Sequence, residues 1–297
     1  MTGTIRGLWL KTIRPLKFLP QSFYVKYYYE YYSGKRLNYG NPQEFNQKLS
    51  WYKVFFRPKI LNVLVDKYAV REYVKEKIGE RYLNECYGVF NNPERIDFDG
   101  LPQKYVLKGV HGCNLNLLVL DNQKLNKKKA IGTMKKWLSK NQYYRGGLEW
   151  AYKDVKPRIL IERFLHDKKT DDLIDYKFYC FDGAPKFLVA QSDISGRYFY
   201  DLDWNELPFR WKKKYNGKIE KPSNFEELKR LSSKLADNFP FVRVDLYSVD
   251  NKAYFGEMTF YPTDARDDFY PEEYNKIVGD YFRLPKIPNG QKYVTEY

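Results

Sequence analysis

Two carboxylates and an arginine lie at strand-like spacing near the C-terminal end of the sequence. Asp245 stands two residues after Arg243, and Glu257 follows beyond the polar segment 250–252. If that segment is a three-residue turn, the flanking runs form a hairpin in which Asp245 faces Glu257, while Arg243 faces Thr259. Facing carboxylates repel unless a cation lies between them, and hard oxygen ligands beside phosphate oxygens suit Mg²⁺. The same spacing also fits an exposed strand face with scattered charges, so spacing alone leaves both interpretations open.

Two lysines interrupt apolar runs that are typical of strands. Lys108 lies within residues 105–110, and Lys177 lies within residues 175–181. Lysine is rarely buried without a partner, so each side chain either points to solvent or directs its ammonium group at an anion such as phosphate. Taken one at a time, the lysines do not decide between these alternatives.

His111 and Gly112 follow the first of these strands and could begin a loop over phosphates. Backbone N–H groups bind phosphate best where glycine leaves room, and only Gly109 and Gly112 are available here. A simple turn explains the pair equally well. With only two histidines, the chain offers few nucleophile–base pairs for covalent catalysis.

Composition narrows the class of partner. The chain has 297 residues and a formal net charge of +15, and residues 1–60 hold eleven basic residues against two acidic ones. We therefore expect acidic partners, and the basic, aromatic N-terminus favours peripheral contact with the inner face of a membrane. No nucleic-acid-binding motif accompanies the charge, so no nucleic acid is expected. Three widely spaced cysteines and the lack of a secretory signal or long apolar run predict a cytoplasmic protein.

The elements that must position these residues follow from hydrophobic periodicity. The pattern predicts an α+β protein with three parts: a helical segment 1–60, a first lobe 61–165 and a second lobe 166–297. A helix is expected to start around residues 41–45, with Pro42 in its first turn, and another over 223–238, with Ser223 and Glu226 as a capping box. Further elements are predicted in the ranges 66–78 and 126–140 (helices), and 105–110, 117–120, 159–165, 175–181 and 185–191 (strands).

The order of these pieces resembles the ATP-grasp enzymes, and most closely the TupA-like ATP-grasp family. The similarity runs from about Asn41 to Leu284. It rests on ordered motifs that share their sequence with the family, in the ranges 41–49, 66–74, 106–112, 149–152, 156–162, 175–183, 199–204, 239–247 and 256–262. Many members carry His-Gly-Ser-Gly in the loop where this chain has Cys113 and Asn114, and many ATP-grasp enzymes have Asn at the position of Thr259.

The resemblance implies an ATP-grasp fold, in which two α+β lobes clamp ATP with Mg²⁺, and it implies a role for each matching residue. Lys67 and Lys108 would hold phosphates from the first lobe, under a flap that begins with His111 and Gly112. The interlobe strand Glu162, Arg163, Phe164 and Leu165 would read adenine, with Asp167 near the ribose. Lys177 would contact phosphate or ribose, and Arg243 would steady the transferred phosphoryl group. The metal ligands would be Asp245, Glu257 and Thr259.

The activity implied is that of a carboxylate–amine ligase that works through an acyl phosphate. TupA-like proteins are associated with cell-surface polysaccharide and teichuronopeptide synthesis, so the expected partners are an anionic glycan or uronate acceptor and an amino-acid or other amine donor. A kinase or other phosphotransferase on the same clamp remains an alternative. So does a glycosyltransferase or a non-catalytic glycan-synthesis protein with a degenerate ATP site, for which Asp201 and Asp203 would be a superficial metal motif.

Overall fold

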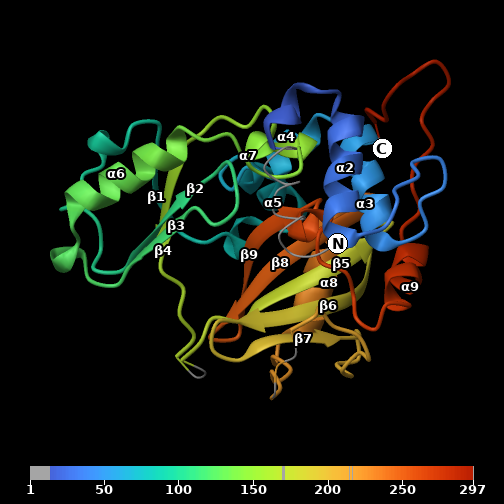
Figure 1. Cartoon of the computed structure of the whole chain (residues 1–297). Coiled ribbons are helices and arrows are strands. Elements are labelled where there is room, and N and C mark those ends of the chain that lie inside the picture. The colour runs from blue at the N-terminus through green and yellow to red at the C-terminus, as the bar shows by residue number, and fades with distance from the viewer. Residues whose placement is uncertain (1–13, 169–170, 214, 216, 297) are drawn as a thin grey trace.

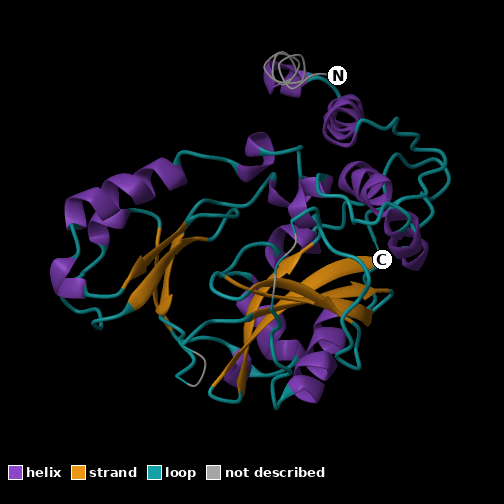
Figure 2. Cartoon of the chain, turned by 60° about the horizontal axis from the view of Figure 1, so that its bottom comes forward, coloured by secondary structure: helices purple, strands orange, loops and turns teal. Residues whose placement is uncertain are grey.

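Two antiparallel sheets organise the protein within residues 14–168, 171–213, 215 and 217–296, which this computed structural model describes (Figures 1 and 2). The smaller sheet has the order β1-β4-β2-β3, from β1 (Cys86–Phe90), β2 (Tyr105–Gly109), β3 (Asn116–Val119) and β4 (Ile159–Arg163). The larger sheet has the order β7-β6-β5-β8-β9, from β5 (Asp175–Phe181), β6 (Ala184–Ser192), β7 (Gly196–Tyr200), β8 (Phe241–Val249) and β9 (Lys252–Thr259). The predicted α+β class is confirmed.

Helices cover these sheets and form an N-terminal layer. The α-helices are α2 (Gln21–Ser33), α3 (Phe45–Phe55), α4 (Ile60–Leu64), α5 (Val70–Lys77), α6 (Lys127–Leu138), α7 (Gln142–Arg145), α8 (Phe225–Ala236) and α9 (Tyr274–Tyr281). Short 3₁₀ turns are η1 (Arg14–Phe18), η2 (Glu80–Tyr82), η3 (Pro93–Arg95), η4 (Asn122–Lys124), η5 (Trp150–Tyr152) and η6 (Pro262–Ala265). None of the helices in the described part of the chain has the length and apolar character needed to cross a membrane.

The smaller sheet has one apolar and one polar face. Tyr105 and Leu107 of β2 pack with Met134 and Trp137 of α6 in one buried cluster. Because side chains alternate along a strand, Lys108 points to the opposite face. Glu162 of β4 shares that face, since it pairs with Val106, next but one to Lys108. The smaller sheet therefore presents a charged face away from α6.

The larger sheet is covered differently on its two faces. On one face, Phe178 of β5 stacks on Phe225 of α8, with ring centroids 6.1 Å apart. On the other face, Phe45 of α3 contacts the rings of Tyr179 and Phe241 at one end of the strands. The polar residues Asp175, Lys177, Arg243 and Asp245 occupy the other end of that face. Lys177, Arg243 and Asp245 are buried, so this end of the face is a buried cluster of charges.

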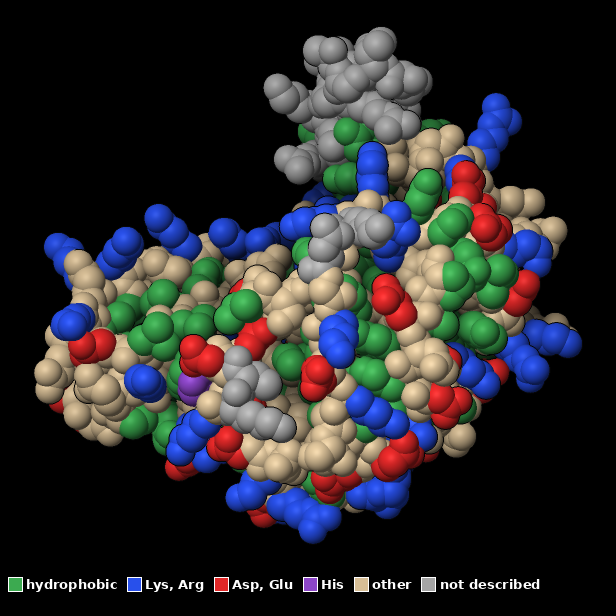
Figure 3. Space-filling model, turned by 90° about the horizontal axis from the view of Figure 1, so that it is seen from below, with side chains coloured by type: hydrophobic (Ala, Val, Ile, Leu, Met, Phe, Trp, Pro, Cys, Tyr) green, Lys and Arg blue, Asp and Glu red, His purple; other side chains and the backbone are tan. Residues whose placement is uncertain are grey.

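The N-terminal helices pack onto the larger sheet. Residues of α4 and α5, such as Leu61 and Val74, belong to the same buried cluster as β5 and β8. The division of the chain at residues 60 and 165 stays a prediction, and residues 1–13 of the expected helical segment lie outside the described part. Lys and Arg side chains surround the rim of the face seen from below, with Asp and Glu among them (Figure 3).

The β8–β9 hairpin brings the predicted pairs together by an unexpected route. Asp245 pairs with Glu257 and Arg243 pairs with Thr259, as predicted. The turn has two residues, since Val249 pairs with Lys252, and a bulge at Gly256 restores the register. A Cβ at Gly256 would lie 2.9 Å from the Asp245 carbonyl oxygen. Glycine therefore permits the close approach of the two strands at this bulge.

Three local expectations were wrong or incomplete. The helix predicted near residue 41 begins only at Phe45, because Glu44 is its N-cap in a capping box with Gln47. Ser223 does not cap α8, because the N-cap of this helix is Asn224. The hydroxyl of Ser223 donates instead to Asn251 Oδ1 at 2.6 Å. Strands β1 and β7 were not predicted, since each has five residues and contains glycine or lies at a sheet edge.

Candidate active site

Glu257 of β9 is held between Lys67, from the turn between α4 and α5, and Arg243 of β8. Its Oε2 atom lies 2.7 Å from Lys67 Nζ, and its Oε1 atom lies 3.2 Å from Arg243 Nη2. The backbone N–H of Lys67 donates to the Val110 carbonyl, which fixes this lysine to the end of β2. Burial alone would raise the pKa of Glu257, but Lys67 and then Arg243 outweigh burial and hold this pKa well below its ordinary value. The carboxylate is therefore ionised across the physiological range.

Asp245 is the buried centre of a second group of charges. Its oxygens accept hydrogen bonds from Arg243 Nε at 2.7 Å and Nη2 at 2.6 Å, and Lys177 Nζ lies 3.0 Å from Oδ2. Lys177 also donates to Asp175. The predicted phosphate contacts Lys177 and Arg243 are thus fixed in place by carboxylates, which limits their rotamers.

Tyr247 lies where the charged faces of the two sheets meet. Its pKa is raised well above the ordinary value, first by the charge of Asp175, then by burial, and further by carboxylates that include Glu162 of the smaller sheet. Burial raises the pKa of Asp175 itself to about 6, with Lys177 opposing it. The charged faces of both sheets therefore act on the same small volume.

Lys108 and Glu162 form the charged face of the smaller sheet. Lys108 Nζ lies 2.7 Å from Glu162 Oε2, and Arg71 Nη1 lies 3.3 Å from Glu162 Oε1. Glu162 carries one negative charge between two positive ones, so this face keeps an excess of positive charge. Arg71 belongs to one of the matching motifs, but no role was predicted for it. It lies on α5 and contacts the same carboxylate as Lys108, so it adds positive charge to this face.

The predicted flap is anchored by the ring of His111. This ring is buried, with Nε2 2.9 Å from the Trp137 carbonyl oxygen of α6, and burial lowers the His111 pKa. The ring of His111 therefore lies on the α6 side of the sheet, opposite Lys108. A contact between phosphate and the backbone of the flap stays a prediction. Asn114, which replaces the second glycine of the family pattern, adopts φ 56°. Asparagine tolerates this left-handed conformation, so the substitution preserves the turn.

Gly112 has a packing role in the same loop. A Cβ at this position would lie 2.9 Å from Gln142 Oε1. Gln142 also donates to Cys113 Sγ at 3.4 Å, so α7 supports the flap from below. The glycine therefore permits contact between the flap and α7.

The predicted adenine-reading segment lies at the end of β4. Both backbone groups of Arg163 bond to residues 84–85, and its Nη2 donates to Tyr254 Oη of β9 at 2.9 Å. Phe164 and Leu165 follow, after the strand pairing has ended. Asp167 Oδ2 accepts from the Asp250 N–H at 2.8 Å, so this carboxylate is positioned at the tip of the β8–β9 hairpin. The adenine and ribose roles stay predictions.

The oxygen donors on the hairpin fit a hard divalent cation. Glu257 keeps a third of its side chain exposed (33%), and Thr259 Oγ1 donates to its Oε1 atom at 3.2 Å. Metal binding by Asp245 requires the exchange of a hydrogen bond with Arg243, because both its oxygens accept from that guanidinium. In the described part of the chain no three His, Cys, Asp or Glu side chains form a metal cage. Such a donor set is typical of Mg²⁺, which takes one or two carboxylates and completes its shell with phosphate and water.

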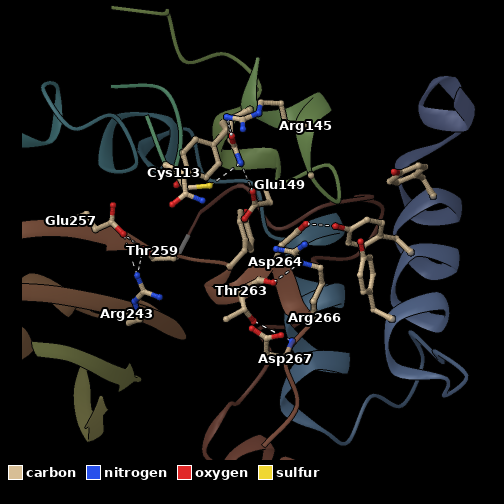
Figure 4. A pocket seen from close by; sticks show the side chains of 18 of the residues that line it. Cys113, Arg145, Glu149, Arg243, Glu257, Thr259, Thr263, Asp264, Arg266 and Asp267 are labelled. Atoms are coloured by element: carbon tan, nitrogen blue, oxygen red, sulfur yellow. Dashed lines mark hydrogen bonds and ion pairs between the residues drawn. The ribbon is translucent and has the colours of Figure 1, made fainter. Parts of the chain in front are cut away.

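A cavity of about 480 Å³, which we call the chamber, opens directly beside Glu257, Arg243 and Thr259 (Figure 4). Its opposite wall is α2, and its other sides come from the flap, α7, β7 and the segment that follows β9. The lining residues are Lys17, Tyr24, Tyr28, Tyr32, Cys113, Asn114, Gln142, Arg145, Gly146, Glu149, Tyr152, Arg197, Arg243, Glu257, Thr259, Tyr261, Thr263, Asp264, Arg266 and Asp267. A second substrate in the chamber would therefore lie next to the predicted phosphoryl-transfer residues.

Asp264 connects this chamber to the N-terminal helices. Its Oδ1 atom lies 2.6 Å from Lys53 Nζ, and its Oδ2 atom accepts from Tyr28 Oη at 2.7 Å and from the Gly147 N–H at 2.8 Å. The backbone at Asp264 is left-handed, with φ 58°, and both neighbouring residues share this conformation. This arrangement costs of order 1 kcal/mol per residue and is stabilised by the buried ion pair.

Sequence reasoning missed this network, although one signal was present. Lys53 lies within the apolar helix segment 51–56, and the test applied to Lys108 and Lys177 would have selected it. Asp264 and Glu149 gave no comparable signal. Their proximity depends on three segments that are more than 90 residues apart in the sequence.

Asp201 and Asp203 lie in a turn. Asp201 Oδ1 accepts from the N–H groups of Asp203 and Asn205, at 2.9 and 2.8 Å. The motif considered for a glycosyltransferase therefore organises a loop.

Comparison with known proteins shows the family to which the chain belongs. The model of the TupA-like ATP-grasp family matches residues 47–283. Comparison with curated proteins gave no match. Among solved structures, D-alanine–D-alanine ligase from Helicobacter pylori has 14% identity and a TM-score of 0.46, covering 82% of this chain and 70% of its own.

Two further structures show the same weak similarity. The D-alanine–D-alanine ligase from Bacillus anthracis, complexed with ATP, has 15% identity and a TM-score of 0.42, with 76% of this chain and 64% of that chain covered. The L-amino acid ligase from Bacillus licheniformis has 13% identity and a TM-score of 0.41, with 66% and 42% covered. This chain thus spans less than two thirds of the length of either enzyme. The family match covers most of the chain and includes every residue of the two charged faces: the chain belongs to the TupA-like ATP-grasp family.

Proposed function

We propose that this chain is an ATP-dependent carboxylate–amine ligase. It joins an amino acid, peptide or other amine to a uronic-acid carboxylate of a cell-surface polysaccharide or its precursor. The family match supports ATP as the phosphoryl donor, and the oxygen donors on β8 and β9 support Mg²⁺ as its metal. The basic and aromatic composition of residues 1–60 supports an acidic acceptor. It also supports a cytoplasmic protein that contacts the inner face of the membrane peripherally.

The position of Glu257 is the observation that carries this proposal. This carboxylate contacts Lys67 from the first lobe and Arg243 from the second, and it borders the chamber. Phosphoryl transfer needs fixed positive charge around the moving group and a second substrate in line with it. Fixed positive charge and room for a second substrate therefore occur side by side at Glu257, which supports the proposal.

The residues have separate tasks in this proposal. Lys67, Lys108 and Lys177 bind phosphates from both lobes, and the flap excludes water. Bound Mg²⁺, held by Asp245, Glu257 and Thr259, would neutralise phosphate charge. Arg243, held by Asp245, stabilises the transferred group while a carboxylate oxygen of the acceptor attacks the γ-phosphorus and ADP leaves. The amine then attacks the acyl carbon, loses a proton, and expels inorganic phosphate as the amide forms.

The test is ADP release from purified protein with Mg·ATP, a uronate and an amine. The proposal requires that release depends on both acceptor and amine, and that mass spectrometry finds an amide. If ADP is released without added amine, and the product is a sugar with a phosphoester on a hydroxyl group, the protein is instead a kinase. If Mg·ATP does not raise the melting temperature, the chain is a non-catalytic factor and the proposal fails.

A further inference from the structure

The chamber carries more positive charge than the chemistry at Glu257 needs. Its lining includes three arginines, Arg145, Arg197 and Arg266, that have no role in the phosphoryl-transfer proposal. They come from three separate elements: the end of α7, strand β7 and the segment after η6. All three side chains are exposed.

These arginines differ from Arg243 in their partners. Arg243 is neutralised by Asp245, whereas none of the three forms an ion pair with any described residue of the chain. Arg266 Nε donates to the Thr263 carbonyl, and Arg145 Nη1 lies 3.4 Å from Gln142 Oε1. These neutral contacts orient the guanidinium groups without cancelling their charge.

The acidic residues of the chamber offset only part of this charge, because Asp267 contributes one negative charge against the three arginines. Asp264 is paired with Lys53, and Glu257 is paired with Lys67. Glu149 is buried, and burial with the nearby charge of Asp264 raises its pKa to about 8, so it is mostly protonated at neutral pH. An unpaired guanidinium binds carboxylate or phosphate through two parallel hydrogen bonds. The chamber is therefore suited to an anionic ligand.

The wall opposite Glu257 is aromatic. Tyr24, Tyr28 and Tyr32 follow one another at intervals of four residues and form a stripe along α2. Neighbouring rings lie 5.8 and 4.8 Å apart, and the bond from Tyr28 Oη to Asp264 fixes the stripe. Tyr24 and Tyr28 are buried within this stripe, and the half-buried Tyr32 leaves part of its ring open to the chamber, where a sugar ring can pack.

We propose that the chamber is the acceptor site and that it recognises an anionic carbohydrate with a second acidic group besides the reacting carboxylate. This inference rests on the proposed function. The reacting carboxylate lies beside Arg243, the sugar ring packs along α2, and Arg145, Arg197 and Arg266 bind the second acidic group. That group is either a phosphate on the same sugar or the carboxylate of a neighbouring uronate, because both offer the same oxygen pairs to arginine.

Calorimetric binding of three probes to the full chain tests this inference. D-glucuronic acid carries one carboxylate, D-glucuronic acid 1-phosphate adds a phosphate, and digalacturonate adds a second carboxylate. We expect one of the doubly acidic probes to bind about tenfold tighter than D-glucuronic acid, since a charge-assisted hydrogen bond contributes on this scale. Which of the two binds tighter identifies the source of the second charge.

Variants separate this site from the nucleotide site. Arg145→Gln and Arg266→Gln should each weaken the preferred probe about five- to tenfold, and the double variant should abolish the preference. Arg95→Gln, at an exposed arginine of η3 outside the chamber, is the matched control and should change nothing. Binding of a non-hydrolysable ATP analogue with Mg²⁺ should be the same in all of them.

Each outcome decides one proposal. Equal affinity for the three probes, or an unchanged preference in the double variant, overturns the acceptor site. Failure of the wild-type protein to bind the ATP analogue overturns the proposed function instead. The probe series still reports on the arginines in that case, because it requires no nucleotide.

Discussion

Lys67 and Glu257 meet across the two sheets, with Nζ 2.7 Å from Oε2. One residue is tied to the end of β2 and the other belongs to β9, so this contact joins the lobes at the point where phosphate and metal are expected. Burial lowers the pKa of Lys67, but the carboxylate outweighs burial and the net shift is upward. Both groups therefore stay charged, and a ligand of opposite sign binds either of them by displacing its partner.

Removing the charge of Glu257 should abolish nucleotide chemistry while the fold persists. Glu257→Gln keeps the size of the side chain but removes a proposed Mg²⁺ ligand and the partner of Lys67. We expect Mg²⁺-dependent ADP release to fall by roughly 100-fold or more. The far-UV circular dichroism spectrum should not change, because this side chain adds little to the apolar core. Glu273→Gln, at the exposed N-cap of α9, should behave as wild type. Unchanged turnover in the Glu257 variant would refute the metal assignment.

The pH dependence of stability should reveal Glu149. Burial, with the charge of Asp264, raises its pKa from 4.5 to about 8. Between these values the folded state holds a proton that the unfolded state has released, so the free energy of unfolding should fall as pH rises from 4.5 to 8. The slope from this group is about 1.4 kcal/mol per pH unit at most. Urea unfolding across this range measures it.

Glu149→Gln is the variant that isolates this contribution. The amide cannot ionise, so the variant should gain stability relative to wild type as pH rises, with the largest gain above pH 8. Equal pH slopes for the two proteins would show that Glu149 ionises normally.

Removal of one partner of the buried ion pair between Lys53 and Asp264 should cost several kcal/mol, because the other charge is left buried and unpaired. Lys53→Met leaves Asp264 without its cation, and we expect a loss of about 3–5 kcal/mol in urea unfolding. Asp264→Asn combined with Lys53→Met removes both charges and should recover part of that loss. A double variant that is no more stable than Lys53→Met would show that the pair does not act through charge.

Alanine should change the stability of the protein in opposite directions at Gly256, in the β8–β9 bulge, and at Gly132 in α6. A Cβ at Gly256 would lie 2.9 Å from the Asp245 carbonyl oxygen and 3.0 Å from Tyr247 Cε2. Gly256→Ala should therefore destabilise the protein by about 1–3 kcal/mol and displace Glu257, with loss of activity. Gly132→Ala in α6 is the control. Nothing lies within 4 Å of its added Cβ, and helix propensity predicts a gain of up to about 1 kcal/mol. Similar unfolding free energies for both variants would contradict the role given to the bulge.

The hairpin also shows how far sequence reasoning reached. The facing pair Asp245 and Glu257 was predicted from alternation and a three-residue turn. The pairing is correct, but the turn is one residue shorter and Gly256 makes up the difference. The error in turn length and the missed bulge cancelled each other, because side-chain alternation constrains the register more strongly than turn length does.

Other features depend on contacts that no local pattern encodes. Ser223 has the sequence of a capping box, yet its hydroxyl bonds to Asn251 from the hairpin turn. The ring of His111 turns to α6 because a carbonyl oxygen of that helix is available to it. The chamber joins α2, α7 and the segment after β9, and its existence follows only from the assembled fold.

The origin of the chamber wall has a consequence for how this protein family can diversify. Tyr24, Tyr28 and Tyr32 lie on a helix that belongs to neither sheet, while the proposed ATP residues lie on or beside the sheets. With the proposed acceptor site, substitutions along one face of α2 would alter the choice of acceptor and leave the proposed nucleotide residues unchanged. Exchange of this helix between relatives offers a direct route to ligases with new specificity, provided that Tyr28 and its bond to Asp264 are kept.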